Sequence, residues 1–414
     1  MPPTLPPISA AKTRLAPLDA EPDGAGRKSL LQLIRGFNMF SVLPDEMVLA
    51  IFAQYHPRYP DCAPQKGDGS PIQLMLVCRR WRDLVINTSN FWRGLWINEE
   101  WSRYRVPTES AREEQDKIDL WLSRAKDHLL SVRLTSEPSA RGHNYIVEAL
   151  SRSRERWEYA ELVIWGESDL PLLIGPAPHL RELALDIAGE VPVDGTPFFA
   201  YDMTPVLERV VVCLSSPGFS LTLSTDNFVL SQTRWRELPS VTFIRDQMAQ
   251  IRPFLTSLCA FDSLVHCRMV GSGPFHGYEN LNVEEPTKVC HRLQSLILQG
   301  HSLGQGFREE REPTMTGYLE TFVTPSLLRL QVPEPFLLPD PVETIRRFIG
   351  KSKCTLRELC ITSSSAEPVE ATLRNYLTAF PSIPSIVVKE EDDTWQDPQH
   401  YIPGPGLLEG GVVY

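Results

Sequence analysis

The feature that most constrains the fold is a short apolar pattern that returns along the larger part of the chain. In each copy, an apolar residue is followed by two spacers, a second apolar residue, one spacer and a third apolar residue. Nine copies occur in order: Leu129-Val132-Leu134, Tyr159-Leu162-Ile164, Leu180-Leu183-Leu185, Leu207-Val210-Val212, Leu238-Val241-Phe243, Leu293-Leu296-Leu298, Leu327-Leu330-Val332, Leu356-Leu359-Ile361 and Ile383-Ile386-Val388. Nine ordered copies, several of them close to Leu-Arg-Glu-Leu, are difficult to attribute to chance. The widest gap, between Phe243 and Leu298, contains a degenerate stretch at Phe261-Leu264-His266 that could fill it.

Each copy predicts one strand of a parallel sheet. Because side chains alternate along a strand, the second and third apolar residues of a copy point the same way and are buried together when copies stack. We therefore expect Leu183, Leu296 and Leu359 to be fully buried. The pattern is similar to that of leucine-rich repeats, although only Leu296-x-Leu298-x-x-His301-x-Leu303 approaches the regular turn sequence. The sequence predicts an irregular solenoid with long insertions such as residues 301–317.

A different set of signals, nearer the start of the chain, predicts three short helices. Leu43-Pro44-Asp45-Glu46 reads as a helix start, followed by apolar residues at positions 47, 48, 51, 52 and 55 on one face. After a Pro- and Gly-rich loop at 57–69, Ser70-Pro71 predicts a second helix that runs through Val77. A third apolar face at positions 77, 81, 84 and 85 ends near Asn87-Thr88, and Phe91-Trp92 follows.

Two segments of this region resemble the F-box. They are LPDEMVLAIF at 43–52 and VCRRWRDLVINTSNFW at 77–92, which match a Leu-Pro-x-Glu helix and a Cys-Arg-x-Trp helix ending in Phe-Trp. The loop between them is longer than usual, and loops tolerate insertion at low entropic cost. The resemblance implies docking on a Skp-type adaptor, which in turn holds a cullin and its RING partner. The adaptor-binding residues that it implies are Leu43, Pro44, Met47, Ile51, Leu76, Val77, Cys78 and Trp81. The alternative for each of them is core packing within the module itself.

Beyond the short apolar segment Leu95 to Ile97, a capping box at Ser110-x-x-Glu113 predicts a connecting helix. Its apolar side carries Ile118, Trp121, Leu122 and Ala125. The order of F-box, Trp-Leu-Ser-Arg helix, Arg156-Trp157 strand and spaced repeats resembles the F-box proteins that are expanded in mushroom-forming fungi. We therefore expect a mixed α/β chain with these parts: a disordered arm at 1–28, an F-box at 29–99, a helical connector at 100–128, a leucine-rich-repeat-like solenoid with a parallel sheet at 129–388, and an acidic, Pro/Gly-rich tail at 389–414.

The composition restricts the classes of partner and the cellular compartment that we expect for this chain. The 41 Lys and Arg residues are outnumbered by 52 Asp and Glu, so no basic excess favours a nucleic-acid backbone. No apolar run approaches the roughly 18 residues that would span a bilayer. Eight cysteines without a CxxC motif, and a start without an apolar signal core, predict reduced thiols in the cytoplasm, the nucleus or both.

The sequence offers little sign of catalysis. It lacks a Gly-x-Ser-x-Gly elbow, a phosphate-binding loop ending in Lys-Ser/Thr, and a His-Glu-x-x-His pair. His266-Cys267 and Cys290-His291 could supply four zinc ligands, but neighbours on a strand point to opposite faces, so ordinary thiols and histidines are favoured. The run Lys389 to Asp393 is likewise favoured as a solvated tail over a metal site. We expect no catalytic residue, no cofactor and no metal.

Together, these features predict the substrate-recognition subunit of an SCF-type (Skp-cullin-F-box) ubiquitin ligase. The F-box would bind the adaptor, and the repeat domain would bind a target protein that the sequence does not identify. One alternative is a leucine-rich-repeat-like interaction scaffold that acts outside a ligase. Another is an enzyme on a new scaffold, which a pocket of titratable residues with perturbed pKa values would favour.

Overall fold

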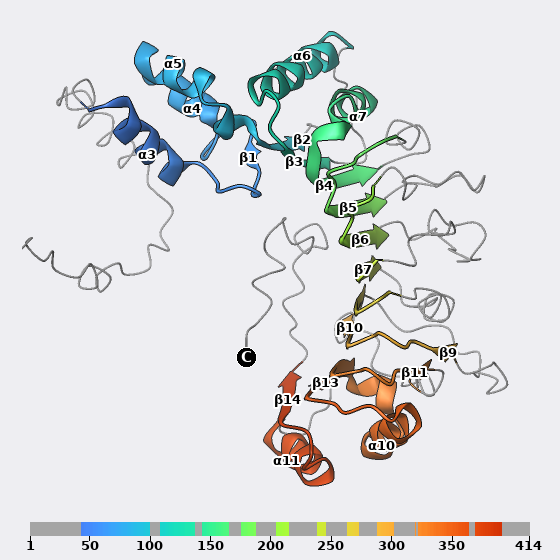
Figure 1. Cartoon of the computed structure of the whole chain (residues 1–414). Helices are drawn as coiled ribbons and strands as arrows, with labels where there is room; N and C mark the ends of the chain where they lie inside the picture. The colour runs from blue at the N-terminus through green and yellow to red at the C-terminus, as the bar shows by residue number, and fades with distance from the viewer. Residues whose placement is uncertain are drawn as a thin grey trace, which may run out of the picture. The chain divides into compact units, whose positions relative to one another are not determined.

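The chain is a mixed α/β protein, shown in Figure 1 as a computed structural model. It divides into two compact units, Met1–Tyr55 and His56–Tyr414. The structure describes residues 43–99, 108–136, 143–164, 175–187, 204–214, 238–245, 263–272, 288–301, 319, 322–363 and 369–390. The arm predicted at 1–28, nearly all of the insertion predicted at 301–317, and the acidic tail from residue 391 onward lie outside these ranges.

In the first unit, helix α3 (Asp45–Tyr55) begins where the sequence predicted. The carbonyl oxygen of Pro44 accepts hydrogen bonds from the backbone nitrogens of Met47 and Val48, at 3.1 and 3.2 Å. Asp45 and Glu46 stand in the first turn, where negative charge is stabilised by the helix dipole. The single apolar face that we predicted for this helix is divided, because only Val48 and Phe52 are buried.

In the second unit, the chain forms α4 (Pro71–Met75), α5 (Arg79–Asn87) and the 3-10 helix η2 (Ser89–Trp92). The cap predicted at Ser70 is confirmed, since its hydroxyl oxygen accepts from the backbone nitrogen of Ile72 at 3.2 Å. Helix α4 ends at Met75, two residues before the predicted end. The Pro- and Gly-rich loop that precedes it also contains an unpredicted strand, β1 (Ala63–Pro64), which pairs in parallel with β2.

The described residues of the second unit form an open sheet of twelve parallel strands whose order across the sheet follows the order in the chain (Figure 1). Its strands after β1 are β2 (Gly94–Glu99), β3 (Leu130–Ser136), β4 (Trp157–Ile164), β5 (Glu182–Ile187), β6 (Arg209–Leu214), β7 (Ser240–Arg245), β8 (His266–Ser272), β10 (Ser295–His301), β12 (Arg329–Pro333), β13 (Glu358–Ser363) and β14 (Ser385–Glu390). All nine predicted copies coincide with strands. Strand β8 fills the widest gap.

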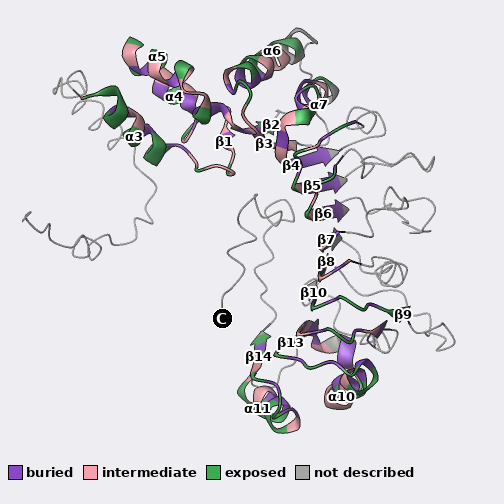
Figure 2. Ribbon diagram, viewed as in Figure 1, coloured by how far each residue is buried: buried purple, intermediate pink, exposed green. Residues whose placement is uncertain are grey.

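The register of these strands places one apolar residue of each copy beside that of the next. The row runs Leu95, Val132, Ala160, Leu183, Val210, Val241, Cys267, Leu296, Leu330, Leu359 and Ile386. Every member except Ile386 is buried, and Leu183, Leu296 and Leu359 are each 1% exposed, as predicted. Figure 2 shows strands β4 to β6 mostly in purple, the colour of buried residues. We call the side of the sheet that carries this row the apolar face, and the opposite side the second face.

The register also corrects three details of the sequence pattern. The copy on β4 is Trp157-Ala160-Leu162, two residues earlier than predicted, and a register shift between Leu130 and Ser131 accompanies it. The copy on β8 is Leu264-Cys267-Met269, three residues later than predicted, because a buried cysteine and a methionine take the places of larger aliphatic residues. Strand β2 carries a further copy, Trp92-Leu95-Ile97, although it lies within the range predicted for the F-box.

A proline turn that the sequence analysis missed precedes four of the strands. In each turn, a buried residue is followed by proline, by a variable residue and then by the first apolar residue of the copy. The carbonyl oxygen of the first residue accepts from the backbone nitrogen of the fourth, at 3.1 to 3.2 Å. The four turns are Ala177–Leu180, Thr204–Leu207, Thr324–Leu327 and Phe380–Ile383. Proline suits the second position of such turns because its φ is already fixed.

Helical segments connect the strands where the chain between them is described. They are α6 (Thr108–Arg124), α7 (His143–Ser151), η3 (Arg154–Arg156), η9 (Glu334–Leu337), α10 (Pro341–Ser352) and α11 (Val369–Ala379). A second, two-stranded sheet pairs β9 (Lys288–Val289) with β11 (Phe322–Val323). Within the described part of the chain, none of the helices has the length and apolar character that crossing a membrane requires.

The connecting helix α6 packs on the aromatic end of η2. It begins at Thr108, so Ser110 lies inside the helix and the predicted cap there is wrong. The predicted apolar side of α6 is buried. The Trp121 ring meets the Trp92 ring edge-on, with centroids 4.9 Å apart, and its Nε1 donates to the carbonyl oxygen of Trp92 at 3.0 Å.

Replacing Leu296 with Ala should lower the free energy of unfolding by roughly 2 to 5 kcal/mol, because the change leaves a cavity between two neighbouring strands. Chemical denaturation of the full chain measures this. Leu377→Ala is the matched control, since Leu377 lies exposed on α11, and it should change stability by less than about 0.5 kcal/mol. Equal losses for the two variants would contradict the stacked register.

Candidate functional site

Two of the predicted adaptor-binding residues lie on one exposed line of α3. Met47 and Ile51 are 53% and 42% exposed, and Tyr55, four residues further on, is exposed as well. Residues four apart share a helix face, so these three form an apolar stripe. Pro44 at the start of the helix is exposed and Leu43 is half-buried. Met47 and Ile51 are therefore exposed side chains and not core residues, which was the alternative interpretation for them.

Three more of the predicted residues lie where α4 meets α5. Leu76 follows the last residue of α4, Cys78 precedes the first residue of α5, and Val77 lies between them. Leu76 is 67% exposed, Val77 is 45% exposed, and Cys78 is exposed too. Trp81 differs from the rest of the predicted set because it is buried, one turn into α5. The exposed side chains thus come from the junction, and Trp81 and Val85 face inward.

These two places hold a large share of the exposed apolar surface. Among the described residues, eleven large apolar side chains are exposed, and five of them are Met47, Ile51, Tyr55, Leu76 and Val77. The other six are distributed over α6, α7, β9, α11, β14 and the turn before β6. Single exposed apolar residues are ordinary, whereas grouped ones are typical of protein interfaces.

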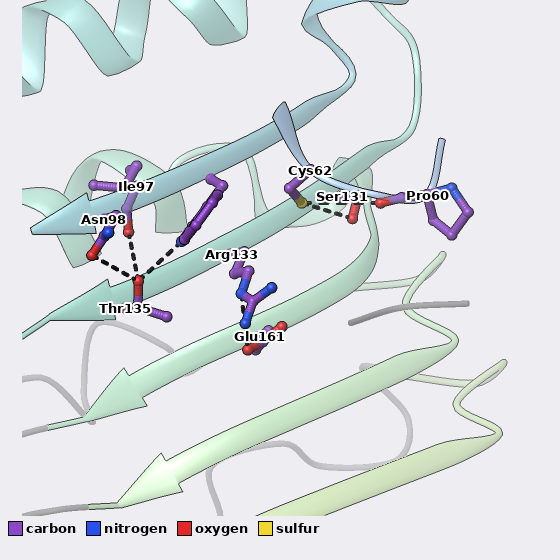
Figure 3. A network of polar contacts seen from close by, with 9 residues as sticks. Pro60, Cys62, Ile97, Asn98, Ser131, Arg133, Thr135 and Glu161 are labelled. Atoms are coloured by element: carbon purple, nitrogen blue, oxygen red, sulfur yellow. Dashed lines mark hydrogen bonds and ion pairs between the residues drawn. The ribbon is translucent and has the colours of Figure 1, made fainter. Parts of the chain in front are cut away.

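A second candidate region is a polar network on the second face, at strands β2 to β4 (Figure 3). Arg133 on β3 lies beside Glu161 on β4, with its Nε 3.1 Å from the Glu161 Oε1. Glu161 is only 2% exposed. Burial raises the pKa of Glu161 to about 7; the positive charge of Arg133 opposes this shift, and the negative charge of Asp186 adds to it. At neutral pH, the protonated form of this carboxyl group is therefore favoured more than it is in an exposed glutamate.

The same network ties strand β1 to the sheet. The Cys62 sulfur lies 3.1 Å from the Ser131 hydroxyl oxygen, and Trp96 Nε1 donates to Thr135 Oγ1 at 3.0 Å (Figure 3). Burial of its sulfur raises the pKa of the Cys62 thiol to about 12. The thiolate is the reactive form of cysteine, so this shift of the pKa lowers the reactivity of the Cys62 sulfur at neutral pH.

Each of the two pairs considered as zinc ligands has one buried and one exposed member; on β8 this is the strand alternation that we predicted, whereas residues 290–291 lie outside any strand. His266 is exposed and Cys267 is buried on β8, while Cys290 is buried and His291 is exposed before β10. No group of three or more His, Cys, Asp and Glu side chains placed to hold a metal occurs within the described ranges.

Sequence reasoning missed the Arg133–Glu161 pair and its network. The signal was present, because charged residues occupy the single spacer between the second and third apolar residues of these copies. Pairing them requires the register, however, and the predicted phase of β4 was two residues out. That shift of two keeps Glu161 on the correct face but opposite the wrong neighbour.

Comparisons with known proteins do not assign the chain to a family. No protein-family model matches it, and no curated protein shows a significant match.

Glu161 should make stability depend on pH. Because its folded pKa is raised above the ordinary value, the folded chain binds more protons than the unfolded chain between pH 4.5 and pH 7, so its contribution to stability falls as pH rises. Glu161→Gln removes this effect. Between pH 4.5 and pH 8, the free energy of unfolding of this variant should therefore rise relative to that of the natural chain, by up to about 3 kcal/mol. Denaturation across this range measures the difference.

The matched control for that experiment is Glu370→Gln, an exposed carboxylate on α11. Its stability curve should run parallel to that of the natural chain. If the Glu161→Gln curve is also parallel, the carboxyl group does not titrate near neutral pH.

Proposed function

We propose that this protein is the substrate-recognition subunit of an SCF-type ubiquitin ligase. In this proposal, the segment that resembles an F-box binds a Skp-type adaptor, and the sheet domain, acting as a leucine-rich-repeat-like solenoid, binds the target. The observation that carries the proposal is the exposure of apolar residues at the positions that the resemblance implies for docking. Met47, Ile51, Leu76 and Val77 are exposed while their neighbours Val48, Phe52 and Trp81 are buried.

This difference within each segment is what supports docking. A helix that only stabilises its own unit needs one buried apolar side, which Val48 and Phe52 already provide on α3. Further apolar side chains that remain in water stabilise the protein only when a partner covers them. Each Å² of apolar surface that is buried then contributes about 25 cal/mol. An apolar partner surface is therefore the simplest role for the stripe on α3 and for the α4–α5 junction.

The sheet domain supports the second half of the proposal. Parallel strands that follow one another in chain order present a continuous second face, and each copy can vary its spacer residues without disturbing the apolar row. A receptor of this kind promotes ubiquitin transfer by raising the effective concentration of the target beside the charged carrier. Its specificity would depend on the side chains of the second face.

The docking half is tested with two paired variants of the full chain, Met47→Ala with Ile51→Ala, and Leu76→Ala with Val77→Ala. Each pair should weaken binding to a Skp-type adaptor by at least about thirtyfold, since buried interface anchors commonly contribute about 2 kcal/mol or more. Titration calorimetry with purified adaptor measures the affinity.

The control for these variants is Leu120→Ala with Leu377→Ala, two side chains that are equally exposed but lie on α6 and α11. The control should bind the adaptor like the natural chain, and all three variants should unfold at the same denaturant concentration. Undiminished adaptor binding by correctly folded docking variants would refute docking through these residues.

The functional half is tested in cells with the same docking variants, which should still bind the target but no longer pass it to the ligase. The target's lifetime should therefore lengthen, as measured by chase after translation is blocked. Point variants suit this experiment better than deletion of residues 41–92, which would remove β1 and the Trp92 that packs on Trp121. A target lifetime that is indifferent to every variant would favour the scaffold outside a ligase.

A further inference from the structure

The loop at 57–69, between the two segments that resemble an F-box, is longer than the connection usual in that family. A connection of this length would cost little entropy if it were left free, so closing it requires no contacts with the rest of the chain. In the structure, however, it contacts strands β2, β3 and β4, and it ends beside the Ser70 cap of α4. The loop therefore links the sheet with the α4–α5 junction.

Tyr59 attaches the beginning of the loop to the sheet. Its hydroxyl group donates to Glu158 Oε2 on β4 at 2.6 Å, and the Arg93 guanidinium lies over its ring, with Cζ 3.7 Å from the ring centroid. The ring also meets the Tyr159 ring edge-on, with centroids 5.9 Å apart. Burial and the Glu158 carboxylate raise the pKa of the Tyr59 hydroxyl, so this group keeps its proton and remains a donor. Three contacts thus hold one side chain of the loop.

The middle of the loop is attached to β2 and β3. The Cys62 sulfur lies 3.1 Å from the Ser131 hydroxyl oxygen (Figure 3), and the next two residues form β1, which pairs with β2. Gly94 makes this close approach possible, because a Cβ atom at its position would lie only 2.7 Å from the carbonyl oxygen of Asp61. A larger residue at position 94 would therefore displace the loop from the sheet.

Hydrogen bonds continue from β1 to the docking surface. The Gln65 backbone nitrogen donates to the carbonyl oxygen of Trp96 on β2 at 3.0 Å, and the Ser70 hydroxyl donates to the carbonyl oxygen of Gln65 at 3.1 Å. Ser70 is fully buried and caps α4, whose last residue, Met75, is followed by Leu76 of the α4–α5 junction. A displacement of the loop would therefore be transmitted to exposed residues that we propose to bind the adaptor.

We propose that the loop at 57–69 positions the docked adaptor relative to the sheet, and that Tyr59 is its main positioning residue. This rests on the proposed function, because the loop would fix the path from the adaptor to the target. Transfer by proximity depends on the distance and the direction between the two, since an acceptor amine has to reach the charged ubiquitin carrier. The loop would therefore control the rate of transfer, and not the affinity for either partner.

The position of α4 is measured with two spin labels on the full chain, at Gln73 on α4 and at Glu208 beside β6, which are both exposed. Double electron–electron resonance should give a narrow distance distribution for the natural loop and a broader one for Tyr59→Ala. The control is Arg58→Ala, which removes an exposed side chain from the same loop and should leave the distribution unchanged. An unchanged distribution for Tyr59→Ala would overturn the role of Tyr59 in positioning.

The consequence for transfer can be measured without knowledge of the target. A short lysine-bearing peptide is attached through an azide-bearing amino acid at position 208 of the full chain. A ligase reconstituted with a Skp-type adaptor, cullin, RING partner and charged carrier then modifies this peptide. Tyr59→Ala should slow transfer at least about fivefold, because the effective concentration of the acceptor depends on how the two sites are held. Adaptor affinity, measured by calorimetry, should match that of the natural chain.

Further substitutions separate positioning from folding. Tyr59→Phe keeps the ring contact with Arg93 and loses only the hydrogen bond, so its transfer rate should lie between those of Tyr59→Ala and the natural chain. Gly94→Ala displaces the loop backbone and should slow transfer, whereas the control Gly350→Ala on α10, where an added Cβ meets no atom within 4 Å, should not.

Transfer at the natural rate in folded Tyr59→Ala and Gly94→Ala chains would overturn the inference. Slower transfer that is matched by an equal loss of adaptor affinity would also overturn it, since the loop would then serve docking itself. A natural chain that binds no adaptor would refute the proposed function instead, and the distance measurement would still decide whether the loop holds α4 on the sheet.

Discussion

The structure depends on the register of a parallel sheet in which each strand buries its apolar residues against its neighbours. No strand in the row that contains Leu183, Val210 and Val241 has a core of its own, because every member is covered partly by the strand on each side. A slip of one residue at any position would turn the buried residues outward and the charged spacers inward. The residues of the apolar face are therefore restricted to apolar types, whereas the residues of the second face can differ from strand to strand.

This division explains what the sequence could predict. Nine strands follow from one spacing, because burial of the same two positions in each copy is the condition for stacking. The degenerate copy on β8 could be located but not phased, since Cys267 and Met269 are not strong apolar signals, whereas the structure buries both. Strands as short as β1 and β9 leave no periodic signal, and β1 exists only because the edge of β2 accepts it.

The candidate sites also differ in how far the sequence could predict them. An apolar residue that binds a partner looks like a core residue in a sequence, so Met47 and Trp81 received one prediction while the structure exposes the first and buries the second. Only the resemblance to the F-box selected the set as a whole. The Arg133–Glu161 pair joins residues on two different strands, and it becomes visible only when the strand register is known.

The agreement between strand order and chain order has a mechanical consequence. Tension applied to the two ends of the second unit would load the outermost strand first, and that strand can detach without disturbing strands beyond its neighbour. From Leu183 to Val210 the chain advances 27 residues, so release of one such strand would free roughly 90 Å of contour. Strand order that matches chain order therefore allows strands to leave the sheet, and to return to it, one at a time from either end.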